Sequence, residues 1–408
     1  MSGPRAVLVA AACAAVLVPC ATAQAAPPAI GAPEAILVEP QTQDIVYARR
    51  ENVRRPIAST TKLMTALLTL ERARLTDVFT AAPYSASPAE SLMGLRPGER
   101  LTVADLLRGL LVVSANDAAS TLAIDVAGSR RRFVALMNQR ARQLGLRDTH
   151  YANPVGLDEP GNYSSAADLV KLTLVLRQRA FFRQTTNLGT VTLHSGSRVR
   201  HLVNRNDLVR SVPYVNGVKT GHTNNAGYIL VGSATRNGVT LVSAVLGDPS
   251  EAARDADTLR LLRYGLSRYH RVMPVRKGAV LASADLKYRD DNVDLVAART
   301  VMRVARRGER LSTRVAGAPT EIEGPLDAGT RVGTILVRQR GRVVDRVALV
   351  TERAVAAPTL GQRVGDYLGR GSTRAVLAVL ALCSLYLALM WRRFTRRRNG
   401  AEGPGLAS

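Results

Sequence analysis

Two residues near the start of this chain could together make a covalent catalyst. Ser59 and Lys62 stand three positions apart, so on a helix their side chains would share one face. The free N–H groups and the dipole of a first helical turn also favour negative charge at Ser59. A serine beside an amine that can take its proton is an activated nucleophile. The spacing therefore predicts a serine nucleophile with a lysine base.

The choice of lysine is informative because the chain has 51 arginines and only 5 lysines. A guanidinium stays protonated in any protein, whereas a buried amine can lose its proton and act as a base. A Ser-x-x-Lys arises by accident roughly 0.3 times at this composition, and Lys219-Thr220-Gly221 on the order of 0.02 times. Burial, or a second cation such as Lys219, would keep Lys62 neutral.

A second motif, Ser114 to Asn116, could complete the chemistry. The Ser114 hydroxyl both donates and accepts, so it could relay a proton toward a leaving amine. Asn116 could hydrogen-bond a substrate amide through both its carbonyl and its amino group. The backbone N–H groups of Ser59 and His222 could form an oxyanion hole.

The third motif, Lys219, Thr220 and Gly221, suits substrate binding, because Thr220 can donate to a carboxylate that Lys219 attracts. Each motif alone also has an ordinary structural interpretation. Ser59 could be a helix cap and Asn116 a helix start, while Lys219 could be a solvated lysine and Thr220-Gly221 a bulge. All three motifs in this order favour an active site.

The composition argues against other classes of protein. With 408 residues, 46% hydrophobic and 22% charged, the chain can form two globular domains plus processing segments. Its net charge of +24 suggests a nucleic-acid partner, but only 4% of residues are aromatic and the arginines are scattered. We therefore predict no nucleic-acid partner.

Both ends of the chain carry targeting signals. Residues 1–25 have the pattern of a secretory signal peptide, with Arg5 before an apolar run and cleavage expected after Ala25. Residues 375–391 form an uncharged run of transmembrane length that is apolar except for Ser384, and a basic tail, 392–408, follows. The positive-inside rule keeps this tail in the cytoplasm. The rest of the mature chain is therefore predicted in the periplasm, anchored to the cytoplasmic (inner) membrane by a single pass.

The cysteines predict no chemistry of their own. Cys13 and Cys20 fall in the predicted signal peptide, and Cys383 lies in the late apolar run. No disulfide or thiolate metal site is therefore available to the exported domains, and we predict neither a metal nor a cofactor.

The pattern of the remaining chain predicts two domains, at 26–271 and 272–358, and a linker at 359–374. The first domain should mix helices with a sheet, and the second should be a small all-β domain. The elements expected in the first domain are a hairpin at 34–48, a helix from Ser59, a helix capped by Thr102 that ends at Leu111, helices at 130–144 and 166–179, strands at 218–221, 228–234 and 239–246, and a helix at 253–269.

With these motifs, the chain resembles the D-alanyl-D-alanine carboxypeptidases, low-molecular-mass penicillin-binding proteins of the penicillin-binding protein 5 type. The resemblance covers roughly residues 30–358. It rests on the sequence in and around the motifs, namely Ala58 to Thr65, Leu95 to Gly98, Ser114 to Ala119, Asn153 to Asp158 and Gly217 to Thr223.

The resemblance implies the α/β (α+β) transpeptidase fold shared by penicillin-binding proteins and β-lactamases. It also implies a serine-type D-Ala-D-Ala carboxypeptidase that removes the terminal D-alanine from peptidoglycan stem pentapeptides. Ser59 would be the acylated nucleophile, with β-lactams as inhibitors that mimic the substrate. Arg254 matches a position that could help bind the terminal carboxylate.

Three features depart from the family pattern, and three other functions stay open. Asn216 stands where an aspartate is common, and Arg130 to Arg132 stand where acidic residues are usual. The anchor is a spanning helix where an amphipathic one is more common. A D,D-endopeptidase would share the motifs, and so would a β-lactamase, for which Glu159 superficially resembles the required glutamate. A non-enzymatic wall-binding scaffold is the alternative from another class.

Overall fold

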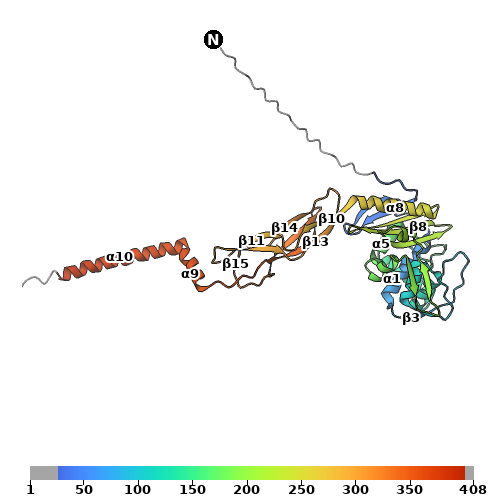
Figure 1. The fold of residues 1–408 in the computed structure, drawn as a ribbon, viewed down its shortest axis with the longest axis horizontal. Helices are drawn as coiled ribbons and strands as arrows, with labels where there is room; N and C mark the ends of the chain where they lie inside the picture. Colours follow the sequence, from blue (N-terminus) through green and yellow to red (C-terminus); the bar gives the residue numbers. More distant parts are fainter. Residues whose placement is uncertain (1–25, 400–408) are drawn as a thin grey trace, which may run out of the picture. The chain divides into compact units, whose positions relative to one another are not determined.

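The chain forms two compact units in the computed structural model, which describes residues 26–399 (Figure 1). The first unit comprises residues 26–38, 45–233 and 242–264, and the second comprises 39–44, 234–241 and the residues from 265 on. The predicted signal peptide lies outside the described residues. The domain limits expected from the sequence stay predictions.

A five-stranded sheet in the order β2-β1-β9-β8-β7 forms the centre of the first unit. Its strands are β1 (Glu34–Glu39), β2 (Asp44–Arg49), β7 (Val215–Thr223), β8 (Gly227–Arg236) and β9 (Val239–Asp248). Asn237 and Gly238 join β8 to β9 with φ of 51° and 76°, the left-handed values that a two-residue hairpin turn requires. The predicted hairpin is confirmed.

The two faces of this sheet bury different helices because side chains alternate along a strand. Ile229 and Val231 of β8 belong to the large apolar core that also contains the helix residues Leu63 and Leu110. The opposite face carries α8 (Glu251–Arg268), which runs along the sheet in Figure 1. A Cβ at Gly232 would lie 2.6 Å from the Thr258 methyl, so α8 packs directly on the strand there.

The five helices expected in the first domain are present and begin close to their expected starts, with one local difference at Ser59, and three further helices among its described residues were not expected. The segment at Ser59 starts as a 3-10 turn, η1 (Ala58–Thr61), before α1 (Lys62–Arg72). The predicted cap is present, since Thr102 Oγ1 accepts from Asp105 N at 3.3 Å. The other helices are α2 (Val103–Val112), α3 (Asn116–Ala127), α4 (Arg130–Gln143), α5 (Ala166–Leu176), α6 (Ala180–Thr186) and α7 (Asp207–Ser211).

Two small hairpins join these helices, and the sequence analysis did not predict them. One pairs β3 (Val78–Thr80) with β4 (Arg100–Thr102), and the other pairs β5 (Thr190–Leu193) with β6 (Arg200–Val203). Strands of three or four residues are too short to show an alternating pattern. The segment between β3 and β4 lies beside the start of α3, because Asp117 accepts from Met93 N and Leu95 N at 3.1 and 2.9 Å.

The second unit contains the predicted all-β domain. Its main sheet has the order β14-β16-β17-β12-β11-β15, and β10 pairs with β13. The strands are β10 (Tyr269–Val275), β11 (Val280–Leu286), β12 (Asn292–Ala297), β13 (Val301–Arg306), β14 (Ser312–Ala316), β15 (Glu321–Ile322), β16 (Arg331–Gln339) and β17 (Arg342–Thr351). A separate apolar core, including Leu295, Ile335 and Leu349, stabilises it.

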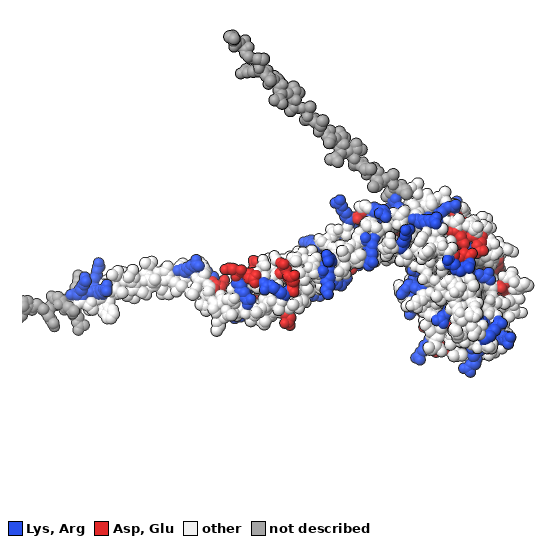
Figure 2. Space-filling model, in the orientation of Figure 1, with Lys and Arg blue, Asp and Glu red and all other residues white. Residues whose placement is uncertain are grey.

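The C-terminal segment differs from the sequence expectation. Residues 359–374 were expected to be a linker, but they contain α9 (Leu360–Gly369), capped by Thr359 and Gln362. The glycines and arginines of this segment are typical of a linker, so the sequence analysis did not predict the amphipathic helix that is present. The next helix, α10 (Gly371–Asn399), has the length and apolar composition to cross a membrane over Gly371–Arg396. Figure 2 shows it as a mostly uncharged rod with basic side chains toward its C-terminal end.

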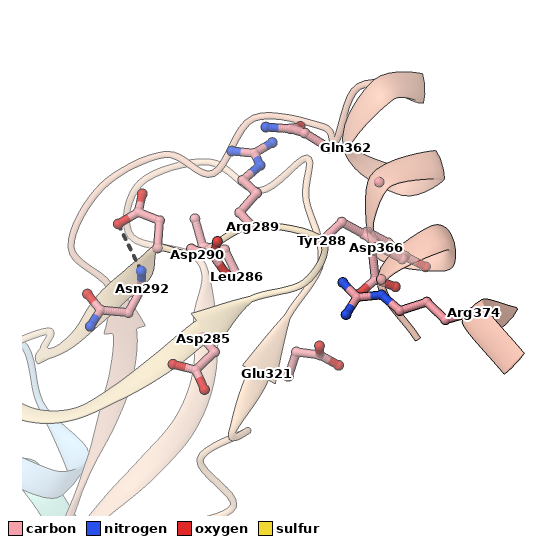
Figure 3. Close-up of a pocket in the computed structure, with 13 residues that line it drawn as sticks. Asp285, Leu286, Tyr288, Arg289, Asp290, Asn292, Glu321, Gln362, Asp366 and Arg374 are labelled. Atoms are coloured by element: carbon pink, nitrogen blue, oxygen red, sulfur yellow. Dashed lines mark hydrogen bonds between the residues drawn. The ribbon is translucent and has the colours of Figure 1, made fainter. Parts of the chain in front are cut away.

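A polar cavity of about 950 Å³ lies in the second unit, between the end of β11 and α9 (Figure 3). Asp285, Asp291 and Glu321 line it from the β domain, and Asp366 and Arg374 line it from the helices. Two of these carboxylates are in ion pairs, Asp291 with Arg353 and Asp366 with Arg370. The three motifs contribute none of its lining residues.

Candidate active site

The structure brings Ser59 and Lys62 into contact. Ser59 lies in η1 and Lys62 begins α1, so the side chains meet within one turn, with Lys62 Nζ 2.8 Å from Ser59 Oγ. Lys62 is fully buried, whereas Ser59 stays partly accessible. Nζ also donates to the carbonyl oxygen of Val155 at 2.5 Å. This second contact aims the amine, so its lone pair can take the Ser59 proton.

Burial makes the Lys62 amine a usable base. Desolvation lowers the pKa of Lys62 from 10.5 to about 7, although the charges of Glu90 and Asp117 act in the opposite direction. A substantial fraction of the amine is therefore neutral near pH 7. The sequence analysis named either burial or a second cation as the cause, and burial is what lowers the pKa of Lys62.

Ser114 and Lys219 form a second serine-lysine contact. Lys219 Nζ donates to Ser114 Oγ at 2.8 Å and to Thr220 O at 2.9 Å. Ser114 joins α2 to α3 with a φ of 65°, a conformation that is rare for serine and that points to a constrained position. The pKa of Lys219 lies well below its ordinary value because of burial, and then because of the charges of Lys62, Arg205 and Arg254. Repulsion from Lys62 therefore adds to the effect of burial at Lys219.

Strand β7 packs against the turn that holds Ser59. A Cβ on Gly221 would lie 3.2 Å from Ile57 O and 3.3 Å from Ser59 N, so only glycine allows this approach without displacement. His222 follows on the same strand, and its exposed ring stacks on Tyr228 with 4.0 Å between ring centroids. Thr220 is 8% exposed, at the surface of the cleft. The third motif thus lies beside the nucleophile.

A loop between α4 and α5 also packs against the Ser59–Lys62 pair. Gly156 has a φ of 90°, and a Cβ there would lie 2.0 Å from Ala58 O, so the loop backbone touches the nucleophile turn. Asp158 ties the loop to the strand side by accepting from Thr223 Oγ1 at 2.7 Å. The sequence analysis named the segment Asn153 to Asp158, but it did not predict that the Val155 carbonyl in this segment accepts a hydrogen bond from Lys62. Side-chain patterns do not report on a backbone carbonyl.

Asn116 begins α3 at the edge of the same cleft. Its Nδ2 donates to Glu90 Oε2 at 2.7 Å, and its backbone N donates to Ser91 O at 2.8 Å. Its Oδ1 is buried and has no partner among residues 26–399. Sequence reasoning did not find Glu90, because no motif surrounds it.

Arg254 of α8 is buried and close enough to Lys219 to lower its pKa. Its guanidinium already donates to Glu251 and Asp255, at 2.8 and 2.9 Å. Glu159, by contrast, is exposed, and its carboxylate accepts from Asn153 Nδ2 at 2.9 Å. The geometry thus favours Arg254 as part of the electrostatics of the site, and it gives Glu159 no contact with the Ser59 pair.

A partly accessible serine in contact with a buried lysine is an arrangement that suits a serine peptidase, and family comparisons agree with this class. The D-alanyl-D-alanine carboxypeptidase model of peptidase family S11 matches residues 21–250. The model of the C-terminal domain of penicillin-binding protein 5 matches residues 269–357. The chain belongs to the S11 D-alanyl-D-alanine carboxypeptidase family.

Individual relatives span both units. D-alanyl-D-alanine carboxypeptidase DacF of Bacillus subtilis is 30% identical over 77% of this chain and 83% of its own length. DacA of Escherichia coli is 32% identical over 84% of this chain and 88% of its own. The structure of penicillin binding protein 5 from Haemophilus influenzae covers 81% of this chain and 99% of its own, with a TM-score of 0.59 and 29% identity. The Streptomyces K15 DD-transpeptidase covers 59% of this chain and 99% of its own, with a TM-score of 0.57 and 31% identity. The fold predicted from the sequence is confirmed.

Proposed function

We propose that this chain is a serine-type D-Ala-D-Ala carboxypeptidase that removes the terminal D-alanine from peptidoglycan stem pentapeptides and is acylated by β-lactams. One observation carries the proposal. A fully buried lysine with a pKa of about 7 lies 2.8 Å from the hydroxyl of a partly accessible serine. That geometry suits a nucleophile and its base near neutral pH.

In the acylation step, Ser59 Oγ attacks the carbonyl carbon of the penultimate D-alanine, and neutral Lys62 takes the hydroxyl proton. The backbone N–H groups of Ser59 and His222 stabilise the oxyanion. When the peptide bond breaks, the leaving D-alanine nitrogen needs one proton. Ser114 donates it and takes up in turn the proton that Lys62 received from Ser59, so that Lys62 is neutral again. The 2.8 Å bond from Lys219 Nζ holds the Ser114 hydroxyl for this relay.

In the deacylation step, a water molecule attacks the acyl-serine carbonyl and gives its proton to Lys62. The ester bond to Ser59 then breaks, and Ser59 Oγ takes that proton back. The enzyme returns to its starting state and releases the shortened peptide. The same base serves both halves, which its pKa near neutral permits.

The terminal carboxylate of the substrate would bind at the strand side. Lys219 and Arg254 supply positive charge there, Thr220 supplies a hydroxyl donor, and Gly221 keeps the strand close to the nucleophile. The internal amide of the peptide would contact Asn116. Because the Arg254 guanidinium already holds two carboxylates, we assign it a role through charge more than through direct contact.

The targeting signals set where this chemistry would occur. The apolar α10 would span the cytoplasmic membrane once, with the basic residues after it inside and both folded units outside, in the periplasm. Such an anchor keeps the enzyme near the peptidoglycan that it would trim. No nucleic-acid partner is part of the proposal.

The alternative functions have less support. A β-lactamase needs a glutamate placed to activate the deacylating water, and Glu159 is exposed and bonded to Asn153. A scaffold would not need two buried lysines, whose desolvation destabilises the fold. An endopeptidase uses the same machinery, so substrate preference decides between it and a carboxypeptidase.

Two measurements test the proposal. Ser59→Ala should abolish covalent labelling by a fluorescent penicillin while the melting temperature stays near that of the wild type, and unchanged labelling would contradict the nucleophile assignment. Incubation with a synthetic pentapeptide should release one D-alanine. If a crosslinked dimer were cleaved and the monomeric pentapeptide were not, the endopeptidase would replace the carboxypeptidase.

A further inference from the structure

The segment between β3 and β4 places a carboxylate against Asn116. Glu90 Oε2 accepts from Asn116 Nδ2 at 2.7 Å and also from the hydroxyl of Tyr84. Glu90 Oε1 accepts from the backbone N of Ser87 at 3.0 Å. The bond from Asn116 N to Ser91 O ties the same segment to the start of α3. Asn116 is thus held at both its backbone and its side chain.

We propose that Glu90 is a positioning residue that fixes the amide plane of Asn116 for substrate binding, an inference that rests on the proposed function. An ionised carboxylate can only accept hydrogen bonds, so the nitrogen of the amide, and not its oxygen, must face Glu90. A rotation of the amide by half a turn would bring two acceptors together. Glu90 therefore selects one of the two orientations.

The selected orientation leaves part of the amide ready for a ligand. One Nδ2 hydrogen is used by Glu90, and the second remains. Asn116 is 4% exposed, and its Oδ1 is buried without a partner among the described residues. Leaving a buried acceptor unpaired destabilises a protein, so such a group is a candidate for a partner that arrives with the substrate. The peptide amide of the acyl donor supplies matching donor and acceptor groups.

Glu90 keeps the charge that this role needs. Burial alone would raise its pKa, but the hydrogen bonds from Tyr84, Ser87 and Asn116 bring the pKa below its ordinary value. The pKa of Tyr84 is raised by burial and by its bond to Glu90, so its hydroxyl stays protonated and keeps donating. Glu90 therefore stays an acceptor and Tyr84 a donor throughout the neutral pH range.

Arg130 supports the segment from the outside, which accounts for one of the unusual arginines at the start of α4. Its guanidinium carbon lies 5.5 Å from the ring centroid of Tyr84, and its Nε donates to Ser120 Oγ at 2.9 Å. The contacts run from Arg130 through Tyr84 and Glu90 to Asn116. Because Arg130 is exposed, its share of the effect should be small.

A double-mutant cycle tests the inference, with the second-order rate of acylation by a fluorescent penicillin as the readout. Glu90→Ala should lower this rate about tenfold, the effect expected when one hydrogen bond to a charged group no longer holds the amide. In an Asn116→Ala background, Glu90→Ala should change nothing further when both rates are measured on the plateau above the acid limb of the pH profile, because there Glu90 acts through that amide. Equal losses in both backgrounds, or no loss in either, would overturn the inference.

A pH profile separates positioning from a general structural effect. The Glu90 charge raises the pKa of Lys62, so Glu90→Ala should move the acid limb of the acylation profile to lower pH by a fraction of a unit. If the acid limb of the profile does not move and the melting temperature of Glu90→Ala falls, Glu90 only stabilises the fold. If Glu90→Ala does not fold, Tyr84→Phe removes one donor to the same oxygen, and a loss of about threefold is expected. Tyr84→Phe at the wild-type rate would then overturn the inference.

The matched control is Glu71→Ala, which removes a carboxylate that pairs with Arg140 at 2.6 Å, outside the site. It should acylate at the wild-type rate. A wild-type protein that penicillin does not acylate would overturn the proposed function, and this inference with it. An active wild type with a wild-type rate in Glu90→Ala would contradict the inference alone.

Discussion

Charged groups in the cleft and on the β domain are held in opposite ways. In the cleft, Lys62 is fully buried, and its pKa is moved toward neutrality. On the β domain, Asp345 is paired with Arg299 and Arg303 at 2.5 and 3.0 Å, and these bonds bring its pKa below the ordinary value. The ion pairs of Asp345 keep its carboxylate ionised at all moderate pH values. The burial of Lys62 leaves its amine able to change its charge near neutral pH, as a catalyst requires.

Removal of the buried amine should give the largest effect. Lys62→Met keeps the volume of the side chain and removes the base, so the rate of acylation by penicillin should fall about 10³-fold. The melting temperature should not fall, because an apolar side chain loses no hydration in that position. Labelling at the wild-type rate would show that another group takes the Ser59 proton. Lys62→Arg should also be inactive, since arginine does not deprotonate.

The pH dependence of the same reaction sharpens the comparison. Lys62 must be neutral to accept a proton, and its pKa is about 7, so the acylation rate should fall about tenfold for each pH unit below that value. Above it the rate should level off. A stopped-flow pH profile with a limb near 10 would mean that burial does not lower the pKa in solution.

Asp248, at the end of β9, extends the comparison to stability. It is fully buried, neither carboxylate oxygen has a hydrogen-bond partner in the described part of the chain, and burial followed by repulsion from Asp257 raises its pKa to about 7. Because this pKa lies above the ordinary 3.8, the stability linked to it is complete below pH 3.8 and is lost as the pH rises through 7.

Asp248→Asn should therefore stabilise the protein at pH 8, by up to about 4 kcal/mol in the free energy of unfolding. At about pH 3.5 the variant and the wild type should be close to equal, because the wild-type carboxyl is then largely protonated in both the folded and the unfolded chain. Thermal or urea unfolding at both pH values measures the difference. An equal shift at both pH values would mean that packing, and not titration, is responsible.

The smallest effect is expected on the β domain. Asp345→Ala removes two ion pairs whose arginines are partly solvated, so unfolding should become easier by less than about 1 kcal/mol. Penicillin labelling should not change. A loss of labelling would show that the β domain takes part in the chemistry.

The sequence was a good guide where chemistry depends on local spacing. Ser59 and Lys62 meet because three residues make almost one helical turn, and the cap at Thr102 and the turn at Asn237-Gly238 are equally local. It was a poor guide at 359–374, where α9 replaces the expected linker. An amphipathic helix of ten residues with glycines inside it gives a weak periodic signal.

Residue types and their order along the chain determined the family, the serine and lysine pairs and the apolar anchor, since each depends on a few neighbouring positions. Only the tertiary structure decided that burial lowers the pKa of Lys62, that the Val155 carbonyl accepts from its amine and that Glu90 accepts from Asn116. Desolvation and contacts between residues tens of positions apart depend on how the chain packs, and no local pattern of side chains records them.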